Sequence, residues 1–227
     1  MKLIYVMDPL CGWCYGNSNH TLALFEAYKD ILDFVIVPDG MWTGPDVRMQ
    51  SPQMASYFQK YDERIGQLTG TEFGEAYFQF IQQQEVKLDS EIPSRAIVTV
   101  QEFWNARNIP FMVALQQARY RDGKDLNIDN TYLEICHQLG IDGAEFLAHF
   151  HSESMKESTQ AAFSMAIQYA SSYPTLLFEE QDQLTLLGQG YSSLAEIAKK
   201  IDLLIGAGGQ KMEILSIDAS TEKRLIV

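Results

Sequence analysis

The stretch "DPLCGWCYG", residues 8–16, holds Cys11 and Cys14 in a C-x-x-C arrangement, and these are two of the three cysteines in the 227-residue chain. Two thiols at this spacing can exchange electrons with a substrate, hold half of a metal site, or pack in a core. The sequence patterns around the stretch indicate which of these roles the fold favours.

A strand pattern precedes the two cysteines, and a helix and a second strand follow them. The apolar run at residues 3–7 is typical of a strand buried on both faces. An apolar stripe at helical spacing covers 22–32, and a strand pattern covers 33–38. This order predicts two parallel strands joined by a right-handed crossover, with the cysteines where the first strand leads into the helix.

The middle of the chain has helical patterns almost throughout. The last of these helices has a capping box, Ser154 with Glu157, and is predicted to bury Phe163 and Ile167. The preceding helices are predicted to begin at Ser51–Pro52, at Ser94, after Pro110, at Thr131 and at Ala144.

Strand patterns return near the end of the chain. Residues 175–180 and 184–189 predict an antiparallel hairpin, a helix over 192–205 follows, and "MEILSID" resembles an edge strand. The order predicts an α/β fold, in which a mixed sheet with helices on both faces is interrupted by a large all-helical insertion. The predicted parts are a discontinuous core at 1–45 and 170–206, the helical insertion at 46–169, and a C-terminal extension at 207–227.

Composition narrows the classes of partner. The formal net charge of −13 argues against a nucleic-acid partner, because phosphate backbones attract clusters of Lys and Arg. The sequence has neither a secretory-signal pattern nor the roughly 18 consecutive apolar residues of a membrane span. We therefore expect a cytoplasmic protein with no membrane partner, and in a reducing compartment a C-x-x-C motif is more often catalytic or metal-binding than structural.

The predicted helix start assigns different roles to the two thiols. Cys11 would lie at or next to the N-cap, where unpaired N–H groups and the helix dipole favour a negative sulfur. Cys14, one turn further on, should be shielded, so we expect Cys11 to attack and Cys14 to resolve. Gly12 and Trp13 add no charge between them, and Trp13 is expected to be a partly exposed apolar contact for substrate.

A zinc site is the main alternative for the thiols. A third cysteine lies beside a histidine at Cys136–His137, so a Cys3His centre is arithmetically available. Cys136 nevertheless falls inside the helical pattern at 131–139, among apolar neighbours. We interpret it as a buried structural cysteine and predict no metal site.

A second informative stretch is "SSYPTLLF", residues 171–178, where Pro174 directly precedes a predicted strand. Most X–Pro bonds are trans, and only about one in twenty is cis in folded proteins. A cis bond here would turn the backbone of Tyr173 toward the helix start, where its N–H and C=O could bind an extended substrate beside Cys11.

These motifs together resemble the DsbA-like branch of the thioredoxin superfamily, and in particular its bacterial cytoplasmic members that are similar to protein-disulfide isomerases. The family pattern of "DP", then C-x-x-C, then an aromatic residue matches Asp8, Pro9, Cys11, Cys14 and Tyr15. Further stretches that resemble the family are "YPT", "TGTEFGEAYF", "DSEIPSRA", "LQQARYRDG" and "GQGY".

The resemblance implies a thioredoxin-like core and a thiol–disulfide oxidoreductase. In such an enzyme Cys11 attacks a substrate disulfide, Cys14 resolves the mixed disulfide, and Tyr173–Pro174 forms a cis-proline loop packed against them. It implies no metal or organic cofactor, with glutathione as a candidate co-substrate. The expected partners are protein or small-molecule disulfides and thiols, and a reductant or oxidant that recycles the cysteine pair.

One family feature is missing. Thioredoxin-like proteins commonly carry a buried acid six residues before the first cysteine, and here that position is Tyr5. The nearest acid is Asp8, in the loop, and without a substitute the proton of Cys14 would leave through water.

Two other functions fit the same residues. Kappa-class glutathione transferases and hydroxychromene-carboxylate isomerases resemble this architecture, but generally lack a C-x-x-C, so Cys14 argues against them. A non-catalytic binding module could use Trp42, Tyr57 and Tyr61 as exposed contacts, although aromatic residues at helical spacing are usually core.

Overall fold

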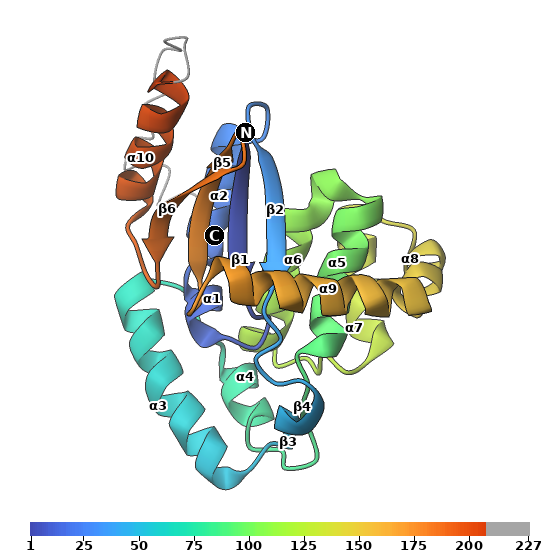
Figure 1. The fold of residues 1–227 in the computed structure, drawn as a ribbon. Helices are drawn as coiled ribbons and strands as arrows, with labels where there is room; N and C mark the ends of the chain where they lie inside the picture. Colours follow the sequence, from blue (N-terminus) through green and yellow to red (C-terminus); the bar gives the residue numbers. More distant parts are fainter. Residues whose placement is uncertain (208–227) are drawn as a thin grey trace.

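The computed structural model describes residues 1–207 and contains a four-stranded mixed sheet (Figure 1). The strand order is β2-β1-β5-β6, with β1 parallel to β2, β1 antiparallel to β5, and β5 and β6 forming the predicted hairpin. The strands are β1 (Lys2–Met7), β2 (Asp33–Pro38), β5 (Thr175–Glu180) and β6 (Gln183–Gln189).

Both faces of β1 are buried because helices cover the sheet on both sides. Leu3, Tyr5 and Met7 pack into a large core together with α2 (Ser18–Tyr28), α6 (Asn108–Tyr120) and α10 (Leu194–Ala207). Ile4 and Val6 point to the other face, which is covered by α9 (Glu153–Tyr169) through Ala166. The continuous apolar run at the start of the chain therefore has the predicted cause, burial on both faces.

The segment between β2 and β5 is helical, as predicted, apart from two 3-10 turns and a two-stranded ribbon of β3 (Arg48–Met49) and β4 (Lys87–Leu88). The boundaries proposed for the helical insertion, residues 46–169, stay a prediction. The helix α9 falls within these boundaries but packs on strand β2 of the core sheet. The predicted edge strand in the C-terminal extension lies outside the described residues. The helices before α9 are α3 (Pro52–Thr69), α4 (Glu75–Phe80), α5 (Glu91–Phe103), α6, α7 (Asp129–Leu139) and α8 (Gly143–Phe150).

Several details of the predicted helices are wrong. The starts predicted at Ser94 and after Pro110 lie inside helices that begin at Glu91 and Asn108. The helix predicted over 22–32 is α2, which begins at Ser18 and ends at Tyr28, and Asn17 separates it from the short helix α1 (Gly12–Gly16). The N-cap of α9 is Ser152, whose hydroxyl accepts a hydrogen bond from the Met155 N–H at 3.2 Å, so the capping box at Ser154 does not form. Ile167 is 75% exposed, because the buried stripe of α9 runs through Met155, Thr159, Phe163 and Ala166.

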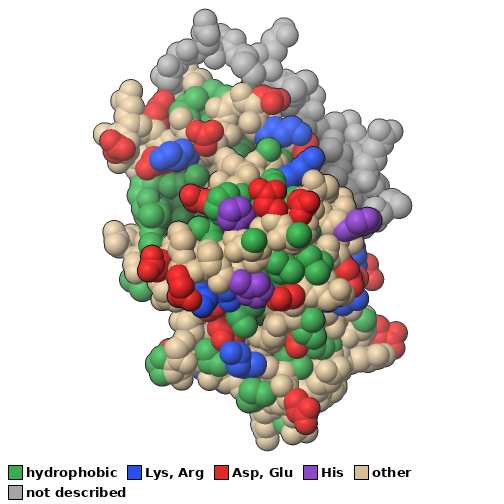
Figure 2. Space-filling model, turned by 90° about the vertical axis from the view of Figure 1, so that its right-hand side faces the viewer, with side chains coloured by type: hydrophobic (Ala, Val, Ile, Leu, Met, Phe, Trp, Pro, Cys, Tyr) green, Lys and Arg blue, Asp and Glu red, His purple; other side chains and the backbone are tan. Residues whose placement is uncertain are grey.

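The acidic side chains are spread over the surface. On the face shown in Figure 2, red Asp and Glu side chains are dispersed among smaller numbers of blue Lys and Arg side chains, with no basic patch. No helix within residues 1–207 is long and apolar enough to cross a membrane.

Candidate active site

Cys11 lies at the start of the first helix, as predicted. It is the N-cap of α1, and its Sγ accepts a hydrogen bond from the Cys14 backbone N–H at 3.3 Å. An N–H group that points at sulfur from a helix start stabilises negative charge there. The two cysteines are not disulfide-bonded, and 8% of Cys11 is exposed against none of Cys14. Only Cys11 can therefore be reached by a substrate.

Cys14 is a thiol that needs a base. Burial raises its pKa well above the ordinary value, and the hydrogen bond and charge of Cys11 raise this pKa further. The backbone N–H of Asp8 acts in the opposite direction, but more weakly. The Tyr5 hydroxyl donates a hydrogen bond to the Cys14 carbonyl oxygen at 3.3 Å.

Asp8 is buried beside the cysteine pair, although sequence reasoning placed it only in a loop. Its Oδ1 accepts from the Leu10 N–H at 2.8 Å and the Ser90 hydroxyl at 3.1 Å, and its Oδ2 accepts from the Met41 N–H at 2.8 Å. Burial raises the pKa of Asp8 to about 6, and these three hydrogen bonds limit the rise. The carboxylate thus connects the loop before Cys11 to the segments that contain Met41 and Ser90. It is also a titratable group close to Cys14.

The proline predicted to face the cysteines has a cis bond. The Tyr173–Pro174 peptide bond is cis, and β5 begins at the next residue. Burial raises the pKa of Tyr173, and the charges of Asp8, Asp39 and both thiols raise it further. Tyr173 is partly buried and packs against the core cluster that contains Cys11 and Cys14.

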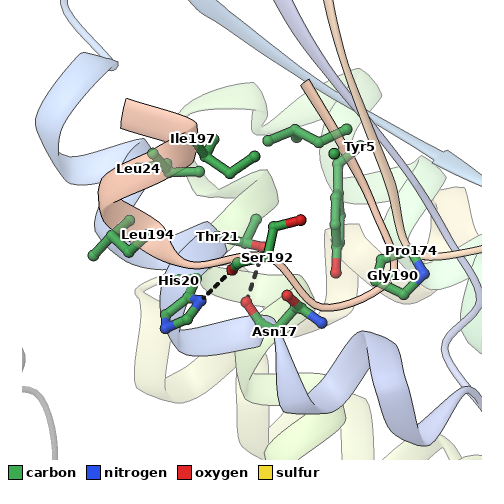
Figure 3. A pocket seen from close by; sticks show the side chains of 12 residues that line it. Tyr5, Asn17, His20, Thr21, Leu24, Pro174, Gly190, Ser192, Leu194 and Ile197 are labelled. Atoms are coloured by element: carbon green, nitrogen blue, oxygen red, sulfur yellow. Dashed lines mark hydrogen bonds between the residues drawn. The ribbon is translucent and has the colours of Figure 1, made fainter. Parts of the chain in front are cut away.

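A small pocket lies behind Pro174 but does not reach either sulfur. It measures about 30 Å³ and lies between α2 and the segment that joins β6 to α10 (Figure 3). Its lining includes Tyr5 and His20, and the His20 Nδ1 lies 3.2 Å from the Ser192 carbonyl oxygen. His20 therefore fixes a loop and does not pair with Cys11.

A larger cavity, of about 240 Å³, opens beside Cys11. One wall is the start of α1, with Gly12 and Trp13, and the facing wall is α3, which lies alongside α1. Its aromatic lining includes Trp42, Tyr57, Phe58 and Tyr61.

The expectation that these aromatic residues are core is wrong for α3. Tyr57 is 56% exposed and Tyr61 is also exposed, because α3 buries only the narrow face that carries Ala55, Asp62 and Ile65. Trp13, on α1, is exposed as predicted. The rim of the cavity is therefore apolar and accessible.

The inner part of the cavity carries two buried charged groups that sequence reasoning missed. Asp62 accepts a hydrogen bond from the Tyr77 hydroxyl at 2.6 Å, and burial raises its pKa to about 6, while Tyr77 and Arg119 act to lower it. Arg119 is 3% exposed, and its guanidinium lies over the rings of Tyr77, Phe80 and Tyr120, at 6.0, 5.5 and 5.6 Å from their centroids.

Gly12 has a geometric role between these groups and the cysteines. A Cβ added at Gly12 would lie 2.3 Å from the Asp62 Oδ1, far inside contact distance. Only glycine lets the carboxylate approach the start of α1, so this position of the C-x-x-C motif is set by α3 as well as by the thiols.

The third cysteine belongs to the core. Cys136 is buried in α7, and burial raises its pKa to about 12. No group of three or more His, Cys, Asp or Glu side chains within residues 1–207 is arranged to hold a metal ion.

Solved structures with a similar fold include proteins of the disulfide reductase and disulfide isomerase classes. A protein from Nitrosomonas europaea, provisionally assigned as a protein disulfide isomerase, is 24% identical with a TM-score of 0.81, over 92% of this chain and 100% of that one. The cytosolic disulfide reductase DsbM from Pseudomonas aeruginosa is 29% identical with a TM-score of 0.71, over 83% of this chain and 89% of that one. DsbM has also been solved with GSH.

The alternative class has a structural neighbour as well. A 2-hydroxychromene-2-carboxylate isomerase matches with a TM-score of 0.57 at 15% identity, over 92% of this chain and 95% of that one. A scan against protein-family models and a search of curated proteins found no match.

The chain has the DsbA-like form of the thioredoxin fold, as its sequence motifs predicted. Within that class, the neighbours support a thiol–disulfide oxidoreductase of the DsbA type.

Proposed function

We propose that this protein is a thiol–disulfide oxidoreductase that works by dithiol exchange through Cys11 and Cys14. The observation that carries the proposal is the pairing of an accessible thiol at a helix N-cap with a buried thiol one turn further on, whose N–H donates to the first sulfur at 3.3 Å.

The exchange takes two steps. The Cys11 thiolate attacks a substrate disulfide, a Cys11–substrate bond forms, and the other half of the substrate leaves as a thiolate that takes up a proton. Cys14 then loses its proton and attacks the Cys11 sulfur, which forms the Cys11–Cys14 disulfide and releases the second substrate thiol. The substrate is reduced by two electrons, and the protein is oxidised by two.

We propose the reductive direction, in the cytoplasm, with glutathione as the thiol that restores the cysteine pair. Two thiols return the electrons to Cys11 and Cys14 and leave as their own disulfide, so the cycle needs no metal or organic cofactor. Support comes from DsbM, a cytosolic disulfide reductase that has been solved with GSH.

Substrate disulfides, on small molecules or proteins, would bind beside Cys11. Gly12 and Trp13 line the cavity there, and the cis Tyr173–Pro174 loop is proposed as the second contact with the substrate. The exposed Trp13 offers an apolar contact, and the Tyr173 backbone offers hydrogen bonds to an extended substrate.

A second candidate is a glutathione-dependent isomerase or transferase. The similarity to 2-hydroxychromene-2-carboxylate isomerase favours it, since that enzyme has the same architecture. Such a function would need one thiol position only, and Cys14 would then be dispensable.

The test is to equilibrate the protein in graded glutathione buffers, quench with acid, alkylate and weigh it. We expect a reversible loss of two protons that maps to Cys11 and Cys14. The variant Cys14→Ser should accumulate a mixed disulfide at Cys11, Cys11→Ser should form none, and Cys136→Ala should behave as the wild type. If no internal disulfide forms at any ratio, dithiol exchange is wrong; turnover that survives in Cys14→Ser would then favour the isomerase or transferase.

A further inference from the structure

Arg119 is a buried cation without an ion-pair partner. No carboxylate within residues 1–207 lies within 4.0 Å of its guanidinium, and its Nε is buried with no hydrogen-bond partner. The guanidinium carbon lies 5.5–6.0 Å from the centroids of three aromatic rings, which supply no hydrogen-bond acceptor for the Nε. Because a buried charge is costly unless it is paired, such a group indicates a missing anion.

The unpaired guanidinium lines the same cavity as Cys11. Asp62 is the acidic group close enough for Arg119 to lower its pKa, but its Oδ2 is already bonded to Tyr77 and the two side chains form no ion pair. The cavity therefore presents a reactive sulfur, a cation and an anion to one bound molecule.

The size of the cavity favours a small molecule. Its volume of about 240 Å³ lies just below the ~300–1,000 Å³ of sites for drug-sized ligands. Planar guanidinium groups bind carboxylates through two parallel hydrogen bonds, which a lone buried Arg can supply.

We infer that the cavity binds a low-molecular-weight, amino-acid-derived thiol or disulfide, with Arg119 binding its carboxylate and Asp62 available for its ammonium group. The inference rests on the proposed function, because it places the sulfur of that compound at Cys11. It makes Arg119 a specificity-determining residue for the co-substrate.

Binding can be tested without any redox chemistry. In a Cys11→Ser background, S-methylglutathione, an unreactive thioether, is titrated by calorimetry. We expect Arg119→Met, which keeps the apolar stem, to weaken binding by about tenfold or more, the usual effect of losing a charge-assisted hydrogen bond. Arg119→Lys should keep part of the affinity. Arg121→Met, on an exposed residue paired with Asp122, is the matched control and should bind normally.

Kinetics separates recognition from a structural role. Arg119→Met should raise the KM for glutathione disulfide by about tenfold or more and leave the KM for bis(2-hydroxyethyl) disulfide, which has no carboxylate, within about twofold. Equal losses on both disulfides, or none on either, would overturn the inference. If the wild type reacts with neither disulfide, the proposed function fails, and the S-methylglutathione titration alone decides the role of Arg119.

Discussion

Asp62 shows how a single buried residue links the site to stability. Its folded pKa is about 6 against an ordinary 3.8, so between these values the folded protein keeps a proton that the unfolded chain has lost. The free energy of unfolding therefore falls as the pH rises through this window. The loss from Asp62 is about 3 kcal/mol by pH 7, at about 1.4 kcal/mol per pKa unit.

The variant Asp62→Asn should remove that cost, because an amide oxygen can still accept the Tyr77 hydroxyl. We expect it to gain stability over the wild type progressively from about pH 4 to about pH 6 and to stay more stable above that. Urea unfolding at several pH values measures this. The pKa of Asp8 is also raised to about 6, so Asp8 adds the same pH dependence to the free energy of unfolding of both proteins, and its contribution cancels in the comparison. Parallel curves for the two proteins would contradict the prediction.

At the scale of one element, α3 decides the shape of the cavity. It carries the exposed aromatic rim on one side and Asp62 on the other, and it begins at Ser51, whose hydroxyl accepts a hydrogen bond from the Met54 N–H at 3.2 Å. Pro52 occupies the first helical position, where its missing N–H has no cost.

Replacing the cap of α3 should weaken the whole protein modestly. We expect Ser51→Ala to lower the free energy of unfolding by about 1 kcal/mol, since one N–H of the first turn loses its partner. Chemical denaturation measures the change. Ser56→Ala on the same helix is the control: its exposed hydroxyl bonds back to the Pro52 carbonyl oxygen, so its loss should be neutral. A destabilisation as large in Ser56→Ala as in Ser51→Ala would refute the capping account.

Helices and strands that have a recognisable pattern in neighbouring residues could be predicted from the sequence. The residues that other helices bring to the active site could not. The runs of β1 and β2 were predicted correctly because buried strands have a continuous apolar composition. The hairpin was predicted correctly from two strand patterns around an acidic turn, although β6 is mostly exposed, and Ser51–Pro52 marked a helix start correctly. Ser154 was wrong because Ser152, two residues earlier, supplies the same cap.

The site divides in the same way. The C-x-x-C motif identified Cys11, Cys14 and the helix start, since all three are neighbours in sequence. Asp62 and Arg119 are single charged residues within helical patterns, and nothing in the neighbouring sequence distinguishes them from charged residues exposed to solvent. Only the packing of α3 and α6 around α1 brings them to Cys11.

At the scale of the whole molecule, the net charge of −13 opposes the approach of an anionic disulfide. We expect the second-order rate constant between the reduced protein and glutathione disulfide to rise severalfold from about 0.01 M to about 0.15 M salt, as screening shortens from ~30 to ~8 Å. The rate with neutral bis(2-hydroxyethyl) disulfide should change little. Stopped-flow measurements of Trp fluorescence can follow both reactions. A rate that falls with salt would mean that the positive charge in the cavity outweighs the overall repulsion.

The sheet also imposes an order in time. β1 lies between β2 and β5, and β5 is separated from Cys11 by more than 160 residues (174 − 11 = 163 to Pro174). On a ribosome that adds about 5–20 residues per second, the cysteines are made roughly 8–33 s before Pro174. During that interval a nascent chain carries both thiols while β1 still lacks its neighbour β5, and thiols in an incomplete fold can react with an oxidant or another cysteine nearby.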